Sequence, residues 1–222
     1  MTAKQTIEEA LHCLLINNGY EKTTYQQVAE LSGYTRALVQ HHLPSKKDFA
    51  ASFYSRMLNL TVEYLSKHGI ERDSAGLMAF GHYAGQISIA FMQMDEDLRR
   101  LTAEMLEYRS VGKLFTDIQR DWSGKWTLDI KPNVNPMEFD GYAYCNGGVF
   151  QCLYEAASEN RCIDPSLASK ALIRSAFESS GLNVDHFEET IGVFALSDET
   201  ISEGCRHIRT TMEHFELPAE ES

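Results

Sequence analysis

The chain has 222 residues and a formal net charge of −12, and 43% of its residues are hydrophobic while 23% are charged. This composition is ordinary for globular proteins, so it excludes a largely disordered chain and predicts a packed core. No stretch approaches the roughly 18 uninterrupted apolar residues of a membrane span, and the first residues lack the basic start and apolar run of a signal peptide. We therefore expect a soluble, cytoplasmic protein with no membrane partner.

The cysteines argue against a disulfide framework and against a zinc cluster. There are five, an odd number, and no two of them form a C-x-x-C pair. Reduced thiols are typical of a cytoplasmic protein. The chain also lacks the G-x-S-x-G, H-E-x-x-H, P-loop and dinucleotide-binding motifs. We expect no metal, no cofactor and no enzymatic activity.

The first predicted element is an amphipathic helix. Thr6 and Glu9 predict a capping box at its start, and Asn18 with Gly19 predicts its end. Its apolar positions recur at the 3.6-residue spacing of a helix that buries one face. These positions are Ile7, Ala10, Leu11, Leu14 and Leu15.

Two shorter helices follow. Thr24 opens the first, with Gln27 as its reciprocal cap, and Gly33 ends it. Thr35 can cap the second, which must end before Pro44 because proline disfavours helical geometry in the preceding residue. Two short helices joined by a glycine-containing turn, preceded by a supporting helix, predict a helix-turn-helix.

Charge is unevenly distributed along the chain. Residues 1–56 hold six Lys/Arg and five Asp/Glu, a net charge of +1, and the remainder carries −13. The segment 32–49 alone gathers Arg36, Lys46, Lys47 and two adjacent histidines against one carboxylate, Asp48. This asymmetry predicts that the N-terminal part interacts with an anion.

The remaining elements also read as helices, and we expect no strands. Ser45 and Asp48 predict a further capping box that opens a longer helix. The stretch 137–160 is apolar on more than one side, with Asn146 on its inner face, which predicts a broadly buried helix. Near the C-terminus an almost coiled-coil-like stripe predicts another helix. The stripe is formed by Ile201, Cys205, Ile208, Met212 and Phe215.

One run, residues 6–54, reads TIEEALHCLLINNGYEKTTYQQVAELSGYTRALVQHHLPSKKDFAASFY. It resembles the DNA-binding domain of the TetR (tetracycline-repressor-like) family, in the GY…TT…VAE.SG core and in YTRALVQHHLPSK, where the family commonly reads like VSRGTLYHHFPSK. The chain departs from the family at Gln40, usually Tyr, and at Leu43, usually Phe. The resemblance covers about a quarter of the chain.

The resemblance implies an all-α homodimer with an N-terminal three-helix helix-turn-helix DNA-binding domain. It places this domain at 1–47 and a larger helical ligand-binding and dimerisation domain at 48–181. The family plan often ends near 181, so 182–222 is expected to be an added helical extension, with ten Asp/Glu against Arg206 and Arg209. The extension could lengthen the dimer interface, cover the ligand pocket or bind a partner.

The resemblance also implies which residues contact DNA. Thr35 and Arg36 would begin the recognition helix, whose first residues meet base edges in the major groove. Leu38 would offer apolar contact, and Gln40 a phosphate or adenine contact. The full set of expected DNA-binding residues is Thr24, Thr35, Arg36, Leu38, Gln40, His41, His42 and Lys46.

Ligand and dimer residues are expected in the larger domain. A pocket between helices needs apolar walls with a few polar groups, although the same aromatic residues could be plain core. Two adjacent helical glycines favour close approach of a second copy. The ligand candidates are Tyr83, Phe91, Tyr108, Trp122, Trp126, Tyr142 and Cys145, and the dimer candidates are Gly147, Gly148, Phe150 and Tyr154.

The function expected from the sequence is a ligand-responsive transcriptional repressor that binds a palindromic operator as a homodimer. Its partners would be double-stranded DNA and a small-molecule effector. The alternative is an interaction protein of the same fold whose DNA binding is weakened or lost, which Gln40 and the acidic surface favour. An enzyme on a helical scaffold is disfavoured by the missing motifs.

Overall fold

In this computed structural model the chain is all-α, as expected from the sequence. The structure describes residues 2–70, 77–130, 140–179, 184–193 and 196–216, without the side chains of 123–144 and 179. Within these residues there is no strand. The helices are α1 (Ala3–Asn18), α2 (Tyr25–Ser32), α3 (Arg36–His42), α4 (Lys46–Lys67), α5 (Leu77–Met92), α6 (Glu96–Leu106), α7 (Arg109–Ile130), α8 (Asp140–Ser158), α9 (Pro165–Ser179), α10 (Phe187–Gly192) and α11 (Asp198–Glu213).

Helix α1 begins one turn earlier than the sequence pattern suggests. Thr2 accepts a hydrogen bond from the backbone N–H of Gln5 at 3.3 Å, and the Gln5 side chain accepts one from the backbone N–H of Thr2 at 2.8 Å. The capping box expected at Thr6 and Glu9 is therefore wrong, because Thr6 already lies inside the helix and is fully buried. The expected end is confirmed, since Gly19 caps the helix with a φ of 85°.

The caps of α2 and α3 and the glycine turn between these helices form as the sequence predicts. Thr24 and Gln27 form the expected reciprocal cap at the start of α2. Gly33 ends α2 in the left-handed region with a φ of 75°, a conformation that costs glycine little and other residues more. Thr35 caps α3 by accepting a hydrogen bond from the backbone N–H of Leu38 at 3.3 Å. We call helices α1–α3 the head.

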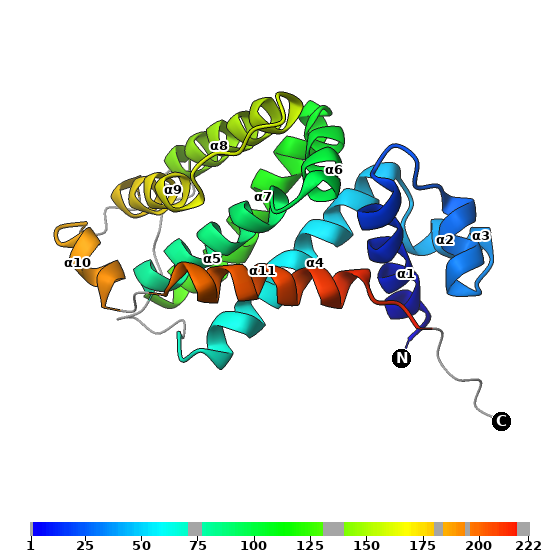
Figure 1. The fold of residues 1–222 in the computed structure, drawn as a ribbon, viewed down its shortest axis with the longest axis horizontal. Helices are drawn as coiled ribbons and strands as arrows, with labels where there is room; N and C mark the ends of the chain where they lie inside the picture. Colours follow the sequence, from blue (N-terminus) through cyan, green and yellow to red (C-terminus); the bar gives the residue numbers. More distant parts are fainter. Residues whose placement is uncertain (1, 71–76, 131–139, 180–183, 194–195, 217–222) are drawn as a thin grey trace.

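Helix α4 connects the head to the rest of the molecule, which we call the body (Figure 1). The Asp48 carboxylate accepts hydrogen bonds from the backbone N–H and the hydroxyl of Ser45, both at 2.7 Å, so the expected cap is confirmed. Phe49 and Phe53 are buried along α4. Helices α8 and α9 pack together at the end of the molecule away from α3 (Figure 1).

The extension folds back along its own chain. Helix α11 packs against α5 and α4 and reaches α1 (Figure 1). Four of the five expected stripe positions are buried, Ile201, Cys205, Ile208 and Met212, whereas Phe215 lies beyond the helix end and is half-buried. The extension therefore joins head and body by intrachain packing. None of the helices in the described residues combines the length and the apolarity that crossing a membrane requires.

A buried histidine lies where the head meets α4. The Nε2 atom of His12 is 2.9 Å from the Ser52 hydroxyl, and the imidazole packs edge-on against Phe53 at 6.2 Å between ring centroids. Burial, and then the nearby positive charge of Arg56, lowers the pKa of His12 from 6.5 to about 3. The neutral imidazole is therefore part of the folded state.

We expect this histidine to make the fold sensitive to acid. Because the folded pKa lies below the unfolded one, the contribution of His12 to stability is complete above about pH 6.5 and is lost as the pH falls toward 3. Between pH 7.5 and pH 5 this loss amounts to about 2 kcal/mol. Urea denaturation at both pH values should show a smaller loss for His12→Gln than for the unmodified protein. Equal losses would contradict this assignment.

Candidate functional site

Helix α3 presents a polar outer face. It lies at the end of the molecule away from α8, α9 and α10 (Figure 1). Val39 is fully buried and packs α3 against the rest of the head, whereas Arg36, Gln40 and His41 are exposed. The outer face therefore offers a guanidinium, an amide and an imidazole to a partner.

The two candidate threonines lie at helix starts. Thr24 and Thr35 are exposed, and each hydroxyl accepts a backbone N–H hydrogen bond of its own helix, from Gln27 at 3.2 Å and from Leu38 at 3.3 Å. A hydroxyl oxygen accepts through its lone pairs and can still donate its hydrogen. In Thr24 that hydrogen points to the Gln27 side chain at 3.0 Å.

Two further candidates are less accessible. Leu38 and His42 are half-buried, and Leu38 packs partly against the core. The His42 ring lies edge-on to His41 at 5.2 Å between centroids. These side chains therefore lie at the border of the outer face of α3.

Lys46 is drawn inward. Its ammonium donates a hydrogen bond to the backbone carbonyl of Thr23 and lies 5.0 Å from the ring centroid of Tyr20 and 5.1 Å from that of Phe49. Burial lowers the pKa of Lys46, against the opposing effect of nearby carboxylates. This lysine ties the start of α4 to the α1–α2 loop, and the neighbouring Lys47 is the exposed cation here. The sequence analysis included Lys47 in the charged segment but not among the expected DNA contacts.

A second candidate site lies inside the body. The Tyr54 hydroxyl and the Asn146 amide both donate to the Gln119 side-chain oxygen, at 2.7 and 2.9 Å. The Ser88 hydroxyl is buried there without a hydrogen-bond partner. These four residues line a cavity of about 10 Å³ between α4, α5, α7, α8 and α9, together with apolar side chains that include Phe150. The sequence signalled only Asn146, as a polar residue on an apolar helix face.

None of the expected ligand residues whose side chains are described lines this cavity. The Tyr83 hydroxyl donates to the Ile191 carbonyl and accepts from the Leu196 N–H, both at 3.2 Å, so it holds the extension to α5. Phe91 is fully buried and stacks near Phe53 in the core. Trp122 lies beside Phe80 and is half-buried.

The other ligand candidates lie elsewhere. Cys145 is half-buried, and burial raises the pKa of its thiol while a hydrogen bond from Ser175 opposes this effect. Tyr108 is 46% exposed, and its hydroxyl donates to the Glu21 carboxylate at 2.8 Å. The side chains of Trp126 and Tyr142 lie outside those that the structure describes.

The residues expected at the dimer interface differ in their exposure. Gly147 and Gly148 are exposed on α8, and a Cβ atom at either position would have no other heavy atom within 4 Å. Tyr154 is half-buried. Phe150 turns inward, with its ring centroid 5.9 Å from that of Tyr54 and 5.7 Å from that of Phe115. Phe150 therefore belongs to the chain's own interior and is unsuited to an outer interface.

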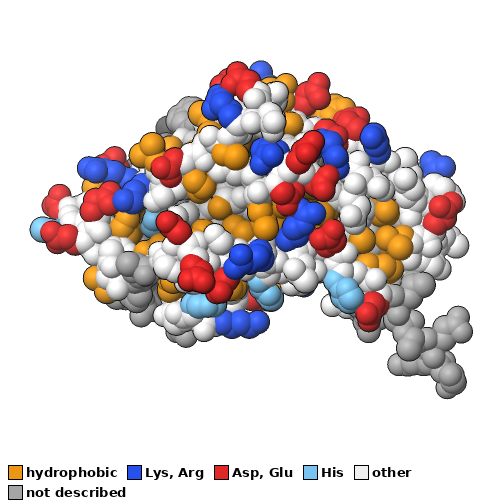
Figure 2. Space-filling model, in the orientation of Figure 1, with side chains coloured by type: hydrophobic (Ala, Val, Ile, Leu, Met, Phe, Trp, Pro, Cys, Tyr) orange, Lys and Arg blue, Asp and Glu red, His pale blue; other side chains and the backbone are white. Residues whose placement is uncertain are grey.

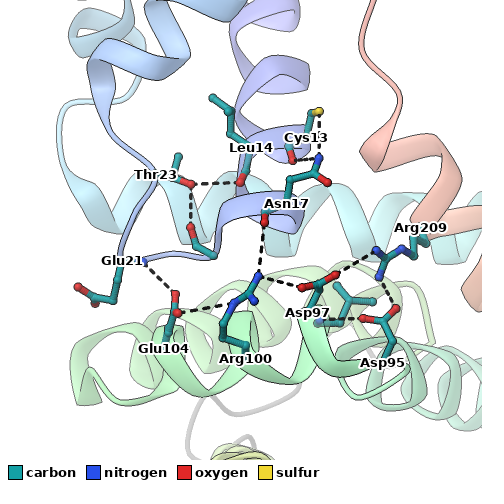
Figure 3. A network of polar contacts seen from close by, with 12 residues as sticks. Cys13, Leu14, Asn17, Glu21, Thr23, Asp95, Asp97, Arg100, Glu104 and Arg209 are labelled. Carbon is teal, nitrogen blue, oxygen red and sulfur yellow. Dashed lines mark hydrogen bonds and ion pairs between the residues drawn. The ribbon is translucent and has the colours of Figure 1, made fainter.

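Helix α6 contacts the loop between α1 and α2. The Glu104 carboxylate accepts a hydrogen bond from the Glu21 N–H at 2.9 Å, and the Arg100 guanidinium donates to the Asn17 carbonyl at 3.4 Å (Figure 3). A Cβ atom at Gly19 would lie 2.6 Å from the Glu104 carboxylate. Helix α6 is therefore in direct contact with the end of α1 and with the α1–α2 loop.

The extension holds the opposite end of the same helix. Arg209 of α11 pairs with Asp95, the N-cap of α6, and lies 3.8 Å from Asp97 (Figure 3). Asp97 in turn pairs with Arg100 at 3.0 Å. A continuous polar network thus runs from α11 through α6 to the α1–α2 loop, and Figure 3 shows it in one view.

The chain matches no protein-family model and no curated protein sequence. Its site is therefore interpreted from its own geometry.

We expect the contact between Gly19 and Glu104 to be measurable by a double-mutant cycle. Gly19→Ala should cost about 1–3 kcal/mol for the backbone alone, because a φ of 85° with a ψ of 172° is a conformation that essentially only glycine adopts, and more in the unmodified protein because the new methyl group displaces the Glu104 carboxylate. In a Glu104→Ala background only the backbone cost should remain. Urea denaturation of the four proteins gives the coupling, expected at about 1 kcal/mol, and a coupling of zero would contradict a close approach here.

Proposed function

We propose that the protein is a ligand-responsive, DNA-binding transcriptional repressor of the TetR type, and that it acts as a homodimer on a palindromic operator. The observation that carries this proposal is the exposed face of α3, where Arg36, Gln40 and His41 project from a short helix that Val39 fixes to the head. A helix of this kind, entered through a glycine turn, fits the major groove of DNA.

The chemistry of the outer face matches base edges. Arg36 can donate two hydrogen bonds to guanine, and Gln40 can pair with adenine through its amide, each worth about 1–3 kcal/mol of discrimination. Lys47 and His41 suit phosphates, which set position rather than sequence preference. Since the segment 33–47 exposes only Arg36 and Lys47 as strong cations, non-specific affinity should be low.

The face of the body shown in Figure 2 also favours binding through a few specific contacts rather than through general attraction to DNA. On the face shown in Figure 2, acidic and basic side chains are intermixed over the body. A surface without a broad positive field gains little from long-range attraction to a polyanion. Binding would therefore depend on the few contacts that α3 and its surroundings make.

The polar network around α6 supports the responsive part of the proposal. An effector that favours another position of α6 would move the α1–α2 loop through Glu104 and Arg100. In a dimer this movement would change the separation of the two α3 helices from the 34–36 Å or so that one turn of DNA requires. The effector would act by its differential affinity for the two arrangements.

The outer face of α8 and α9 is the best candidate for the dimer contact. Gly148 leaves open space on α8, and Leu167 on α9 is 67% exposed. Small residues allow close approach of a second helix, and an exposed leucine gains from being covered. A dimer contact at this end of the molecule would leave the head of each copy free to bind DNA.

We expect selection from a random-sequence duplex library to yield a palindromic site, and its affinity can be followed by fluorescence anisotropy. Arg36→Ala and Gln40→Ala should each weaken binding about tenfold, because each removes a base contact. Arg206→Ala, exposed on α11, should leave affinity unchanged. Binding should weaken only modestly with salt, because the salt dependence scales with the number of phosphate contacts and each copy exposes few cations near α3.

Two outcomes would count against this proposal. If Arg36→Ala and Gln40→Ala together leave the affinity unaltered, α3 does not read the site. If the library yields no preferred sequence, the alternative gains support, namely a protein of this fold that has lost DNA binding and contacts another partner.

We expect Gly148→Arg to produce a monomer, because the long side chain would occupy the space proposed for the second copy. The matched control is Gly192→Arg, since Gly192 is also exposed at a helix position with nothing near its Cβ. Sedimentation velocity should show a dimer for the unmodified protein and for Gly192→Arg. A dimer that survives Gly148→Arg would place the interface elsewhere.

A further inference from the structure

Phe150 separates two spaces that otherwise belong together. On its inner side is the cavity of about 10 Å³ with Tyr54, Ser88, Gln119 and Asn146. On its outer side is a surface groove of about 640 Å³ between α7 and α8, where Gly112 and Gly147 leave open space and where the charged residues Glu107, Arg109 and Lys113 are part of the lining. Phe150 lines both, and its side chain is 6% exposed. Phe150 is the one lining residue that the groove and the cavity share.

The inner cavity is polar but uncharged. Its hydrogen-bonding groups are two side-chain amides and two hydroxyls, from Gln119, Asn146, Tyr54 and Ser88. No carboxylate, ammonium or guanidinium is among the residues that line it. Such a site can satisfy a neutral polar group, and it offers no compensation for the desolvation of a charged one.

The unpaired Ser88 hydroxyl favours a ligand that can form a hydrogen bond inside this cavity. It is buried on α5, belongs to a residue only 6% exposed, and has no hydrogen-bond partner among the described residues. Buried hydroxyl groups in proteins are almost always paired, because leaving one unpaired costs free energy. A ligand that brings an oxygen beside Ser88 would recover this cost, whereas a purely apolar ligand would not.

We propose that the groove and the cavity form one ligand site, gated by Phe150, for a neutral, flat molecule with a hydroxyl or carbonyl group. The polar group lies among Ser88, Gln119 and Asn146, and the ring takes the place of the Phe150 side chain against Tyr54 and Phe115. The combined space is within the range of small-molecule sites, roughly 300–1,000 Å³. The inference that this molecule is the effector rests on the proposed function, but its binding to the chain does not.

The gate explains how the ligand could act. Phe150 packs edge-on against both Tyr54 of α4 and Phe115 of α7, and Tyr54 stacks on Phe115 with ring centroids 4.2 Å apart. Displacing the Phe150 ring therefore disturbs the contact between α4, which leads to the head, and α7, which follows α6. Ligand binding and head position would be linked through these rings.

Phenol, toluene and benzoate test the site, since they share one ring and differ in having a neutral hydroxyl, no polar group or a negative charge. Binding to the full chain at pH 7 can be measured by ligand-observed NMR titration. Phenol should bind at least tenfold more tightly than benzoate, and Phe150→Ala should tighten phenol binding by opening the gate. Ser88→Ala should weaken phenol binding about fivefold, as expected for one hydrogen bond, while toluene binding stays unchanged.

Controls separate binding from folding. Ser88→Ala removes a hydroxyl without a partner, so its thermal stability should be equal to or above that of the unmodified protein. Ser202→Ala, exposed on α11, should change neither stability nor binding of any probe. Benzoate bound as tightly as phenol, phenol binding indifferent to Ser88→Ala, or no phenol bound by Phe150→Ala would each overturn the proposal. Because the assay contains no DNA, a failure here leaves the DNA-binding proposal standing, and loss of that proposal leaves this result unaffected.

Discussion

The position of the head depends on a short polar contact, the hydrogen bond from the Glu21 N–H to the Glu104 carboxylate. Gly19 makes this contact possible, because any side chain there would collide with that carboxylate. The same helix that carries Glu104 is tied at its other end to α11 through Asp95 and Arg209. The head is thus held to the body by α4, by α11, which packs against α1, and by α6, whose two ends are both fixed. Helix α6 therefore contacts the head at the end of α1 and at the α1–α2 loop.

The local elements of the head could be predicted from the sequence because their signals are short-range. The caps at Thr24, Thr35 and Asp48 need only residues three positions apart, and Gly33 needs only its own φ. The start of α1 was misplaced since Thr2 and Gln5 form an equivalent box one turn earlier. The apolar periodicity of the C-terminal segment likewise predicts the buried stripe of α11, but the local sequence does not show which helices this stripe packs against.

The interior site was largely missed for the same physical reason. Tyr54, Ser88 and Gln119 come from three helices, so only tertiary packing brings them together around Asn146. Helix α8 is apolar on more than one side, so periodicity does not show that Phe150 faces the interior, and Tyr108 lies between α6 and α7, where no helical periodicity applies. Conversely, Lys46 was expected to reach outward, but the rings of Tyr20 and Phe49 and the Thr23 carbonyl hold it inside. Sequence patterns located the outer face of α3, and only the fold located the cavity.

The central claim is that two copies of α3 enter successive major grooves on one side of a DNA duplex. Hydroxyl-radical footprinting of the selected duplex tests it most directly. The account predicts two protected segments on the same face of the DNA, related by a two-fold axis and about one helical turn apart. A single protected segment, or uniform protection along the duplex, would contradict it.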